Sequence, residues 1–289
     1  MQAICILAHK DFKQTFKLAN LMRSAFEVYI HFDTKFKLGQ EEKNQMDQAG
    51  IHYLQCVNVN WGAWGIGEAA YLLMKEAIKD PAITYVHIIS AQDYPVMPIK
   101  SIYQFYEGSD AIYMLSEPAD EVKIAGESLL LWQKYYFNYD KLNRRTLYGK
   151  IYHRISLALQ TIKRVDKLAD LQISDRIYHG ANWMDLPRDA VLYLLDTFDG
   201  NENLRKIFQT GYCSDEFWVQ TILYNSLFKD RITQNIHRFV KWEKQHGSFP
   251  AILDETNFSE FVEQDFQFIR KVDSSYSAAL IRMIDEKLL

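Results

Sequence analysis

Two acidic residues follow a serine in residues 211–223, which read Gly-Tyr-Cys-Ser-Asp-Glu-Phe-Trp-Val-Gln-Thr-Ile-Leu. Apolar residues recur at helical spacing from Phe217 onward and Ser214 is a good N-cap, so the pattern predicts a buried helix with Asp215 and Glu216 in its first turn. The helix dipole favours ionised carboxylates there. Either both acids only complement the helix start, or one of them is a proton acceptor that faces a cleft.

A basic pair, Arg270 and Lys271, ends a strand-like run near the C-terminus. Such cations can neutralise a diphosphate leaving group where no metal does so; the competing interpretation is an exposed loop. The Asp-x-Asp pattern of a metal site is missing, because Asp33 is followed by Thr34 and Lys35 and Asp93 has no second acid two residues away. The histidines show no metal-binding spacing either. We therefore expect no divalent metal and no cofactor.

Several familiar catalytic and binding motifs are missing from the sequence. There is no phosphate-binding loop of the G-x-x-x-x-G-K-[ST] type and no G-x-S-x-G nucleophile elbow. The glycines 62, 65 and 67 do not form a dinucleotide fingerprint after the first strand. A formal net charge of −4 gives no indication of nucleic-acid binding.

The composition is that of an ordinary globular protein, with 289 residues, of which 48% are hydrophobic and 14% aromatic. This length allows one large α/β domain or two small ones. Cys5, Cys56 and Cys213 are too far apart in the sequence for a disulfide framework or a zinc site. The sequence shows no signal peptide and no apolar run of membrane-spanning length. We expect a cytoplasmic protein.

Strands and helices alternate in the first 115 residues. Strands are predicted at 3–8, 27–32, 51–59, 84–89 and 111–115, and helices from 12 to about 25 and at 40–49, 68–79 and 99–106. This order predicts a mostly parallel sheet flanked by helices, with ligands beyond the carboxyl ends of the strands. The polar or aromatic residues expected there could be turn formers, but as a set they favour a shared nucleotide site: His9, Asp33, Trp64, Gln92 and Asp93.

Residues 116–169 are predicted to be helical. Within them, residues 147–171 combine an apolar stripe with a cluster of basic residues. That combination fits a helix on an anionic membrane surface, and it also fits a domain helix with a solvated basic face. In the residues that follow, the pattern predicts a strand-like run from 177 and then a helix to about 198. Further on it predicts a strand at 236–242, a helix near 258–263, a strand-like run at 266–273 and a closing helix.

With these motifs in hand, the chain resembles the core-2/I-branching β-1,6-N-acetylglucosaminyltransferase family, which also contains the peptide O-xylosyltransferases (glycosyltransferase family 14). The resemblance runs over nearly the whole chain and depends on short segments in a fixed order. They are Ala8-His-Lys, His31-Phe-Asp-Thr-Lys35, Trp61-Gly-Ala-Trp-Gly, Ser90-Ala-Gln-Asp-Tyr-Pro95, His179-Gly-Ala-Asn-Trp183, Ser214-Asp-Glu-Phe217, Arg238-Phe-Val-Lys-Trp242 and Phe268-Ile-Arg-Lys-Val-Asp273.

The resemblance implies a GT-A-like fold over residues 1–289, with a nucleotide-binding half (1–115), a helical acceptor- or membrane-facing region (116–171) and a catalytic and acceptor half (172–289). It implies metal-independent, inverting transfer from a UDP-sugar, with Glu216 as general base. On the donor side it implies Lys271 with Arg270 at the diphosphate, and Ala8, His9, Asp33, Trp64 and Asp93 around the nucleotide. On the acceptor side it implies Gly180, Asn182, Trp183 and Trp242.

The sequence departs from the family pattern at Gly65 and Ser214, where serine and proline are common, and residues 117–170 do not align well. The membrane anchor and the many cysteines of secretory-pathway members are missing, which suggests a bacterial-type cytoplasmic enzyme, peripheral at the inner face of the membrane, that builds a surface polysaccharide. UDP-GlcNAc is the expected donor and UDP-xylose the alternative, with a glycan or glycolipid as acceptor. A non-catalytic carbohydrate- or nucleotide-binding module and a sugar-nucleotide hydrolase are the rival functions.

Overall fold

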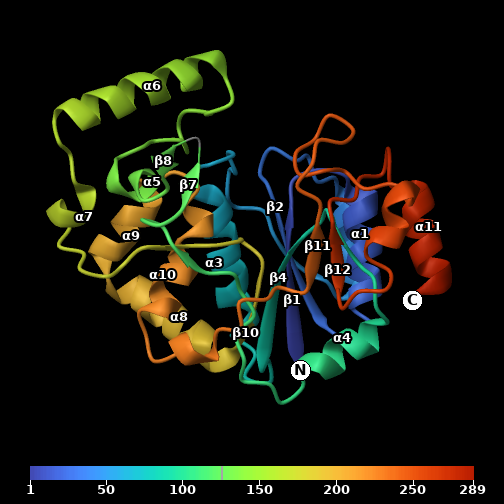
Figure 1. Ribbon diagram of the computed structural model, residues 1–289. Coiled ribbons are helices and arrows are strands. Elements are labelled where there is room, and N and C mark those ends of the chain that lie inside the picture. Colours follow the sequence, from blue (N-terminus) through green and yellow to red (C-terminus); the bar gives the residue numbers. More distant parts are fainter. Residues whose placement is uncertain (125) are drawn as a thin grey trace.

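The computed structural model describes residues 1–124 and 126–289. Its central sheet has the strand order β10-β4-β1-β2-β3, in which only β10 is antiparallel to its neighbour (Figure 1). The strands are β1 (Gln2–Ala8), β2 (Glu27–Phe32), β3 (His52–Leu54), β4 (Tyr85–Ser90) and β10 (Met184–Pro187). The predicted α/β architecture with a mostly parallel sheet is confirmed.

Helices cover both faces of this sheet, which explains why β1 is a continuous apolar run. Side chains alternate between the faces of a strand. Ala3 and Cys5 therefore join the core under one helical layer, and Ile4 and Ile6 join the core under the other. The first layer is formed by α3 (Gly65–Ala77), α8 (Arg188–Gly200), α9 (Glu202–Gln209) and α10 (Trp218–Tyr224), and the second by α1 (Phe12–Met22), α2 (Gln40–Ala49) and α4 (Ile99–Tyr106).

A second, smaller sheet has the order β11-β12-β5. It joins β5 (Asp93–Pro95), which follows the fourth strand of the central sheet closely, to β11 (Arg238–Val240) and β12 (Phe268–Arg270). The closing helix α11 (Ala278–Lys287) packs on it. The strand at β5 is absent from the sequence-based expectation, and it matters because it brings residue 93 next to residue 270.

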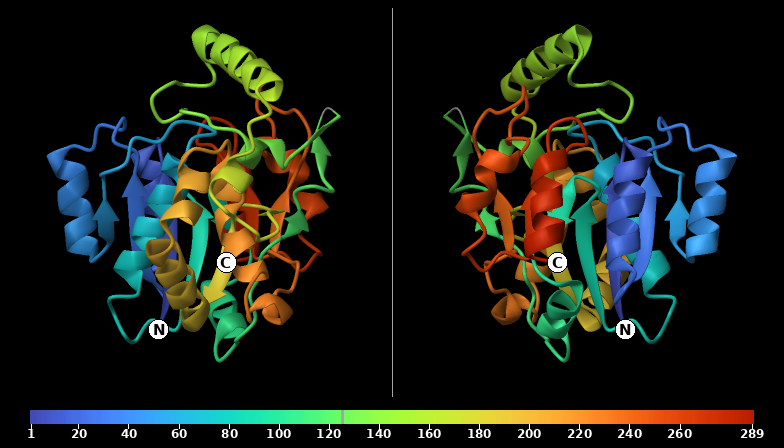
Figure 2. Two further views of the ribbon diagram at one scale, coloured as in Figure 1. Left: turned by 90° about the vertical axis from the view of Figure 1, so that its left-hand side faces the viewer. Right: turned by 90° about the vertical axis from the view of Figure 1, so that its right-hand side faces the viewer.

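The expectation that residues 116–169 are helical is wrong for much of that segment, of which Ala125 lies outside the described residues. The segment contains β6 (Glu117–Pro118), β7 (Lys123–Ile124), β8 (Glu127–Ser128), α5 (Leu131–Lys134), α6 (Leu147–Ile162) and α7 (Lys167–Asp170). The helix predicted at 147–171 ends at Ile162, because Arg164 takes a positive φ of 53° and breaks it. Figure 2 shows α6 standing apart from the body of the molecule.

Three predicted elements match residue for residue, namely β2, α2 and α4. The strand predicted at 51–59 is shorter, because its second half bonds to side chains: the backbone N–H of Val57 donates to His31 Nε2 (3.2 Å) and that of Val59 to Asp33 Oδ1 (3.3 Å). Residues 111–115 form isolated bridges at Ile112 and Tyr113 and no full strand. The helix near 258–263 is a 3₁₀ turn, η3 (Glu255–Glu260).

The remaining elements are β9 (Tyr178–His179), η1 (Ser214–Glu216) and η2 (Lys229–Arg231). Strand β9 pairs with β6, so the segment between them leaves and rejoins the body at one place. Within the described ranges 1–124 and 126–289, no helix has both the length and the apolarity needed to cross a bilayer.

Candidate active site

The turn that carries Glu216 differs from the predicted helix start. Ser214 is not the N-cap, because its hydroxyl donates to Gln133 Oε1 (3.0 Å) and the chain enters the 3₁₀ turn η1 through Cys213, whose φ is +51°. The two acids therefore precede α10 and do not lie in its first turn. Their environments differ, since Asp215 is buried while the Glu216 side chain is 35% exposed.

Burial and the adjacent charge of Glu216 raise the pKa of Asp215 well above its usual range. A carboxyl group in that state favours its neutral form and has no access to a substrate. Glu216, in contrast, presents its carboxylate to solvent. Of the two acids, Glu216 is therefore the one whose carboxylate a ligand could reach, and Asp215 is enclosed by the protein.

The loop between β9 and β10 contacts the Glu216 turn at its first residues. His179 Nε2 lies 3.4 Å from Glu216 Oε2, and the backbone N–H of Gly180 donates to the Glu216 carbonyl (2.8 Å). Gly180 leaves no room for a side chain, because a Cβ there would lie 1.8 Å from the carbonyl oxygen of Leu115. These contacts fix the distance between the loop and Glu216.

At its other end, the same loop contacts the strand that carries the basic pair. The guanidinium of Arg270 lies 4.2 Å from the ring centroid of Trp183, a cation–π contact. Glu216 and Arg270 thus contact opposite ends of residues 179–183. Four residue steps span at most about 14 Å, so the two points of contact on this loop lie no farther apart than that.

Asp93 holds Arg270 in place. Its Oδ1 accepts from Arg270 Nη1 (2.8 Å), its Oδ2 accepts from the Ser90 backbone N–H (2.8 Å), and its side chain is fully buried. The sequence predicted that Asp93 contacts the nucleotide-sugar. The structure places both of its oxygens in contacts within the protein, so its connection to a ligand runs through Arg270.

Lys271 is half-buried and contacts Ser248 Oγ at 3.4 Å. Among the described residues it forms no salt bridge with a carboxylate. Burial and then the charges of Arg270, Arg145 and Lys10 lower the pKa of Lys271 to about 8. A half-buried ammonium group surrounded by other cations is a favourable position for an anionic ligand.

The carboxyl ends of β1 and β2 meet beside these cations. The backbone N–H of Asp33 donates to the Ala8 carbonyl (2.9 Å), and the next residue of the chain is the exposed His9. Burial of the ring and the charges of Lys10, Arg270 and Lys271 lower the pKa of His9, whereas the charge of Asp33 raises it. His9 therefore lies within electrostatic reach of both Asp33 and the basic pair.

Asp33 itself is buried, and its oxygens are already engaged. Oδ1 accepts from the backbone N–H groups of Lys35 (3.0 Å) and Val59 (3.3 Å), and Oδ2 lies 3.3 Å from Lys35 Nζ. Most of its bonding capacity is used to close the loop after β3. Its predicted contact with a nucleotide would have to use the remaining lone pairs.

Two arginines before α6 also approach the site. The Arg145 guanidinium lies 5.0 Å from the ring centroid of Trp61, and its charge contributes to the lowered pKa of Lys271. The charge of the neighbouring Arg144 acts near the two acids. Burial and the charges of Glu216 and Asp215 raise the pKa of Cys213, and the charge of Arg144 opposes that rise. The charges of these two consecutive residues thus act on Cys213, beside the two acids, and on Lys271.

The predicted tryptophans have different environments. Trp64 is 4% exposed, stacks on Phe198 (5.3 Å between ring centroids) and packs edge-on against Trp218 (5.6 Å), so it is a core residue with little surface for a ligand. Trp242 is 65% exposed and lies against Phe249 (5.8 Å), which leaves most of its ring free to contact a sugar. Asn182 is buried, and its Oδ1 has no hydrogen-bond partner among residues 1–124 and 126–289.

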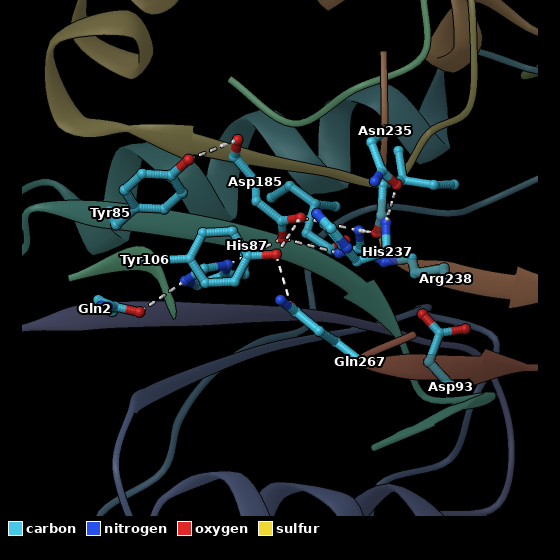
Figure 3. A network of polar contacts seen from close by, with 12 residues as sticks. Gln2, Tyr85, His87, Asp93, Tyr106, Asp185, Asn235, His237, Arg238 and Gln267 are labelled. Carbon is cyan, nitrogen blue, oxygen red and sulfur yellow. Dashed lines mark hydrogen bonds and ion pairs between the residues drawn. The ribbon is translucent and has the colours of Figure 1, made fainter. Parts of the chain in front are cut away.

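A buried network that sequence reasoning missed connects the two sheets (Figure 3). Arg238 on β11 forms a bidentate ion pair with Asp185 on β10, at 2.9 and 3.0 Å, and both side chains are at most 1% exposed. His87 and Tyr106 also bond to Asp185, at 3.0 and 3.1 Å. Burial alone would raise the pKa of Asp185, but Arg238 and His87 outweigh it and lower this pKa.

This network positions the strand that carries Arg270, because β11 pairs with β12 and Val240 lies opposite Arg270. One sequence feature could have indicated the network, namely a charged residue in each of two otherwise apolar strands, Met184-Asp-Leu-Pro and Ile236-His-Arg-Phe-Val. A second missed residue is His179, whose position next to Glu216 becomes visible only in the fold. Within the described part of the chain, no group of three or more histidine, cysteine or acidic side chains is arranged to hold a metal ion.

The arrangement combines an accessible carboxylate with a set of cations in an α/β fold, and comparisons with known proteins identify the family of the chain. No curated protein matches the sequence. Among solved structures, the apo form of the bifunctional glycosyltransferase WbbM is similar over 93% of this chain, with a TM-score of 0.40 and 8% identity, and the chain spans 45% of that protein's length. The family model of the Core-2/I-Branching enzyme matches residues 3–270. Because that match covers nearly the whole chain, the protein belongs to the Core-2/I-Branching enzyme family.

Proposed function

We propose that the protein transfers a sugar, GlcNAc in the first instance, from a UDP-sugar to a hydroxyl of a glycan or glycolipid, with inversion and without a divalent metal. The observation that carries this proposal is that Glu216 and Arg270 contact opposite ends of one five-residue loop. A proton acceptor and a cation at that separation suit an acceptor hydroxyl and a diphosphate leaving group on either side of an anomeric carbon.

In the proposed reaction, the acceptor hydroxyl attacks the anomeric carbon from the face opposite the diphosphate, and the bond from that carbon to the diphosphate oxygen breaks. The carboxylate of Glu216 takes the hydroxyl proton as the new bond forms, which is worth roughly a hundred- to ten-thousandfold in rate. UDP leaves as an anion. One displacement inverts the anomeric configuration, so a single carboxylate suffices.

The cations on the donor side stabilise the departing diphosphate in this proposal. Lys271 has no carboxylate partner among the described residues, and Arg270 is aimed by Asp93 and Trp183. Positive charge that is fixed before the reaction stabilises developing negative charge without reorganisation. This is the role that a metal ion plays in many other transferases, and the two cations can supply it here.

The test is a UDP-release assay with UDP-GlcNAc, UDP-xylose and other UDP-sugars, in EDTA and in manganese. We expect turnover in EDTA, loss of turnover by at least about a hundredfold in Glu216→Gln, and unchanged UDP binding in that variant. Asp215→Asn is the matched control, because this neighbouring acid is buried, and it should retain activity.

Each rival function has its own outcome in this assay. Undiminished turnover in Glu216→Gln would remove that residue from the base role, and a strict requirement for manganese would contradict the metal-free mechanism. UDP release that no glycan accelerates would indicate a sugar-nucleotide hydrolase. UDP binding without release from any donor would indicate a binding module, and a preference for UDP-xylose would change the sugar but not the mechanism.

A further inference from the structure

Helix α6 has one face that nothing in the described protein covers. It projects from the body of the molecule in Figures 1 and 2, and within its sixteen residues only Gly149 is buried. Its inner side is attached to the protein: Gln160 bonds to the backbone N and O of Tyr136 (2.7 and 2.8 Å), and Tyr152 and Leu157 pack against the aromatic cluster that contains Tyr139.

The outer side of α6 carries a stripe of large apolar residues. At 100° per residue they fall within about one third of the helix circumference, opposite the side that Gln160 and Leu157 occupy. Their exposed fractions are unusually high for apolar side chains: Leu147 77%, Tyr148 67%, Ile151 48%, Ile155 55%, Leu159 50% and Ile162 78%. A continuous exposed apolar stripe of this size is a mark of an interaction surface.

The charges around the stripe indicate what covers it. Between Asp140 and Asp166 the sequence contains seven basic residues and no acidic one, although the whole chain has a formal net charge of −4. Lys150 and Arg154 flank the stripe on one side and Lys163 on the other. A partner for this surface must therefore be apolar in the middle and anionic at the edges.

An anionic lipid bilayer has that chemistry, whereas a second copy of this helix does not. A two-fold contact between two α6 stripes would bring the basic flanks of both copies together, and like charges at an interface are unfavourable. In a bilayer, apolar side chains enter the acyl boundary and basic side chains reach phosphate headgroups.

We propose that α6 lies in the surface of an anionic membrane, with its apolar stripe in the lipid and its basic flanks on the headgroups. The segment before α6 carries Arg144 and Arg145, which approach the acidic turn and the basic pair, so the catalytic face lies next to the membrane. The acceptor is then a glycan carried on a lipid; this last step depends on the proposed function, whereas membrane binding does not.

The test is co-sedimentation of the full chain with vesicles of phosphatidylcholine alone and of phosphatidylcholine mixed with an equal amount of phosphatidylglycerol. We expect binding to the mixed vesicles that is at least about tenfold stronger and that weakens with added salt. The double variants Ile155→Glu with Leu159→Glu, and Lys150→Glu with Arg154→Glu, should each lower binding to mixed vesicles by at least about tenfold.

Matched controls come from outside the helix. Leu227 is 78% exposed, so Leu227→Glu places a charge on an apolar residue that is more exposed than Ile155 or Leu159. Lys37→Glu with Lys100→Glu makes the same charge change as the basic double variant on exposed lysines elsewhere. All controls should bind vesicles like the unaltered protein. Thermal unfolding of each variant checks that it is folded, which is expected because every altered side chain is exposed.

Three outcomes would overturn the proposal: no binding to the mixed vesicles, equal binding to both kinds of vesicle, or loss of binding in the controls as well. The protein could instead fail to bind vesicles and form a concentration-dependent dimer that Ile155→Glu with Leu159→Glu abolishes. That result would identify a second copy of the chain as the partner of this surface. The vesicle assay needs no donor or turnover, so failure of the proposed transferase activity would leave its result intact.

Discussion

The imidazole of His179 lies beside the carboxylate of Glu216, with 3.4 Å between Nε2 and Oε2, and its ring packs edge-on against Phe217 at 5.0 Å. The contact joins the first residue of the loop 179–183 to the accessible acid of the 3₁₀ turn. Several expected results follow from this contact and from the groups around it.

Replacement of His179 should affect Glu216 and leave the donor site unchanged. In His179→Ala we expect kcat to fall by about tenfold, less than for removal of the base itself, with little change in KM for the UDP-sugar. The pH profile of kcat should also change, which a purely structural role would not produce. His52→Ala, an exposed histidine on β3, is the control and should behave like the unaltered enzyme.

Loss of the Asp93 carboxylate should release Arg270. In Asp93→Asn the guanidinium loses its buried ionic partner and is held only by its contact with Trp183, so we expect a stability loss of about 3 kcal/mol and a raised KM for the UDP-sugar. Denaturant unfolding and donor kinetics measure the two effects. Asp199→Asn removes an exposed partner of Lys75 and should cost less than about 1 kcal/mol. Unchanged donor kinetics in Asp93→Asn would exclude the proposed link through Arg270.

UDP affinity should depend on pH through Lys271. Its pKa in the free protein is lowered to about 8, so the ammonium form dominates below pH 8 and is lost as pH rises through that value. A bound diphosphate favours the charged form, so affinity should begin to weaken above about pH 7, to about twofold at pH 8 and about tenfold at pH 9. Calorimetric titration with UDP measures this change.

Two controls separate this effect from general alkaline damage. Uridine lacks the diphosphate, so its affinity should not show the same decline above pH 8. Lys271→Met should bind UDP weakly at every pH and lose the pH dependence. A decline that persists in Lys271→Met would assign it to another group.

Substitution of the two tryptophans Trp64 and Trp242, which the sequence assigned to the site, should have different effects on stability and on the rate of transfer. Trp64→Ala removes a core side chain and should cost about 3–5 kcal/mol in unfolding free energy. Trp242→Ala should leave stability within about 0.5 kcal/mol and lower the rate of transfer to a glycan acceptor. A normal acceptor rate in Trp242→Ala would show that its exposed ring does not contact the acceptor.

The elements that the sequence predicted correctly are those whose pattern lies within a few consecutive residues. The continuous apolar run of β1 and the helical pattern of α2 and α4 can be read from neighbouring residues. The end of the third strand could not, because the N–H groups of residues 57 and 59 bond to side chains of β2 and the loop after it. The prediction of Ser214 as an N-cap was wrong for the same reason, since its hydroxyl donates to Gln133, which lies 81 residues earlier in the chain.

The candidate site was predictable in its residue types and only partly in its contacts. Glu216, Arg270 and Lys271 could be recognised by their positions in motifs. The pairing of Asp93 with Arg270 joins residues 177 positions apart, and the second sheet that creates it has strands of only three residues. Such short strands leave no periodic signal, so neither that pair nor the Asp185–Arg238 network could be inferred from sequence.

The close approach of Gly180 to the Leu115 carbonyl has a consequence for how the stretch between these residues could change in length. Residues 115 and 180 bracket the stretch that contains α5, α6 and α7, and the chain leaves and re-enters the body where they meet. An insertion or deletion within that stretch would therefore leave both of its ends in place. A substitution at Gly180 would not, because any side chain there would collide with the Leu115 backbone.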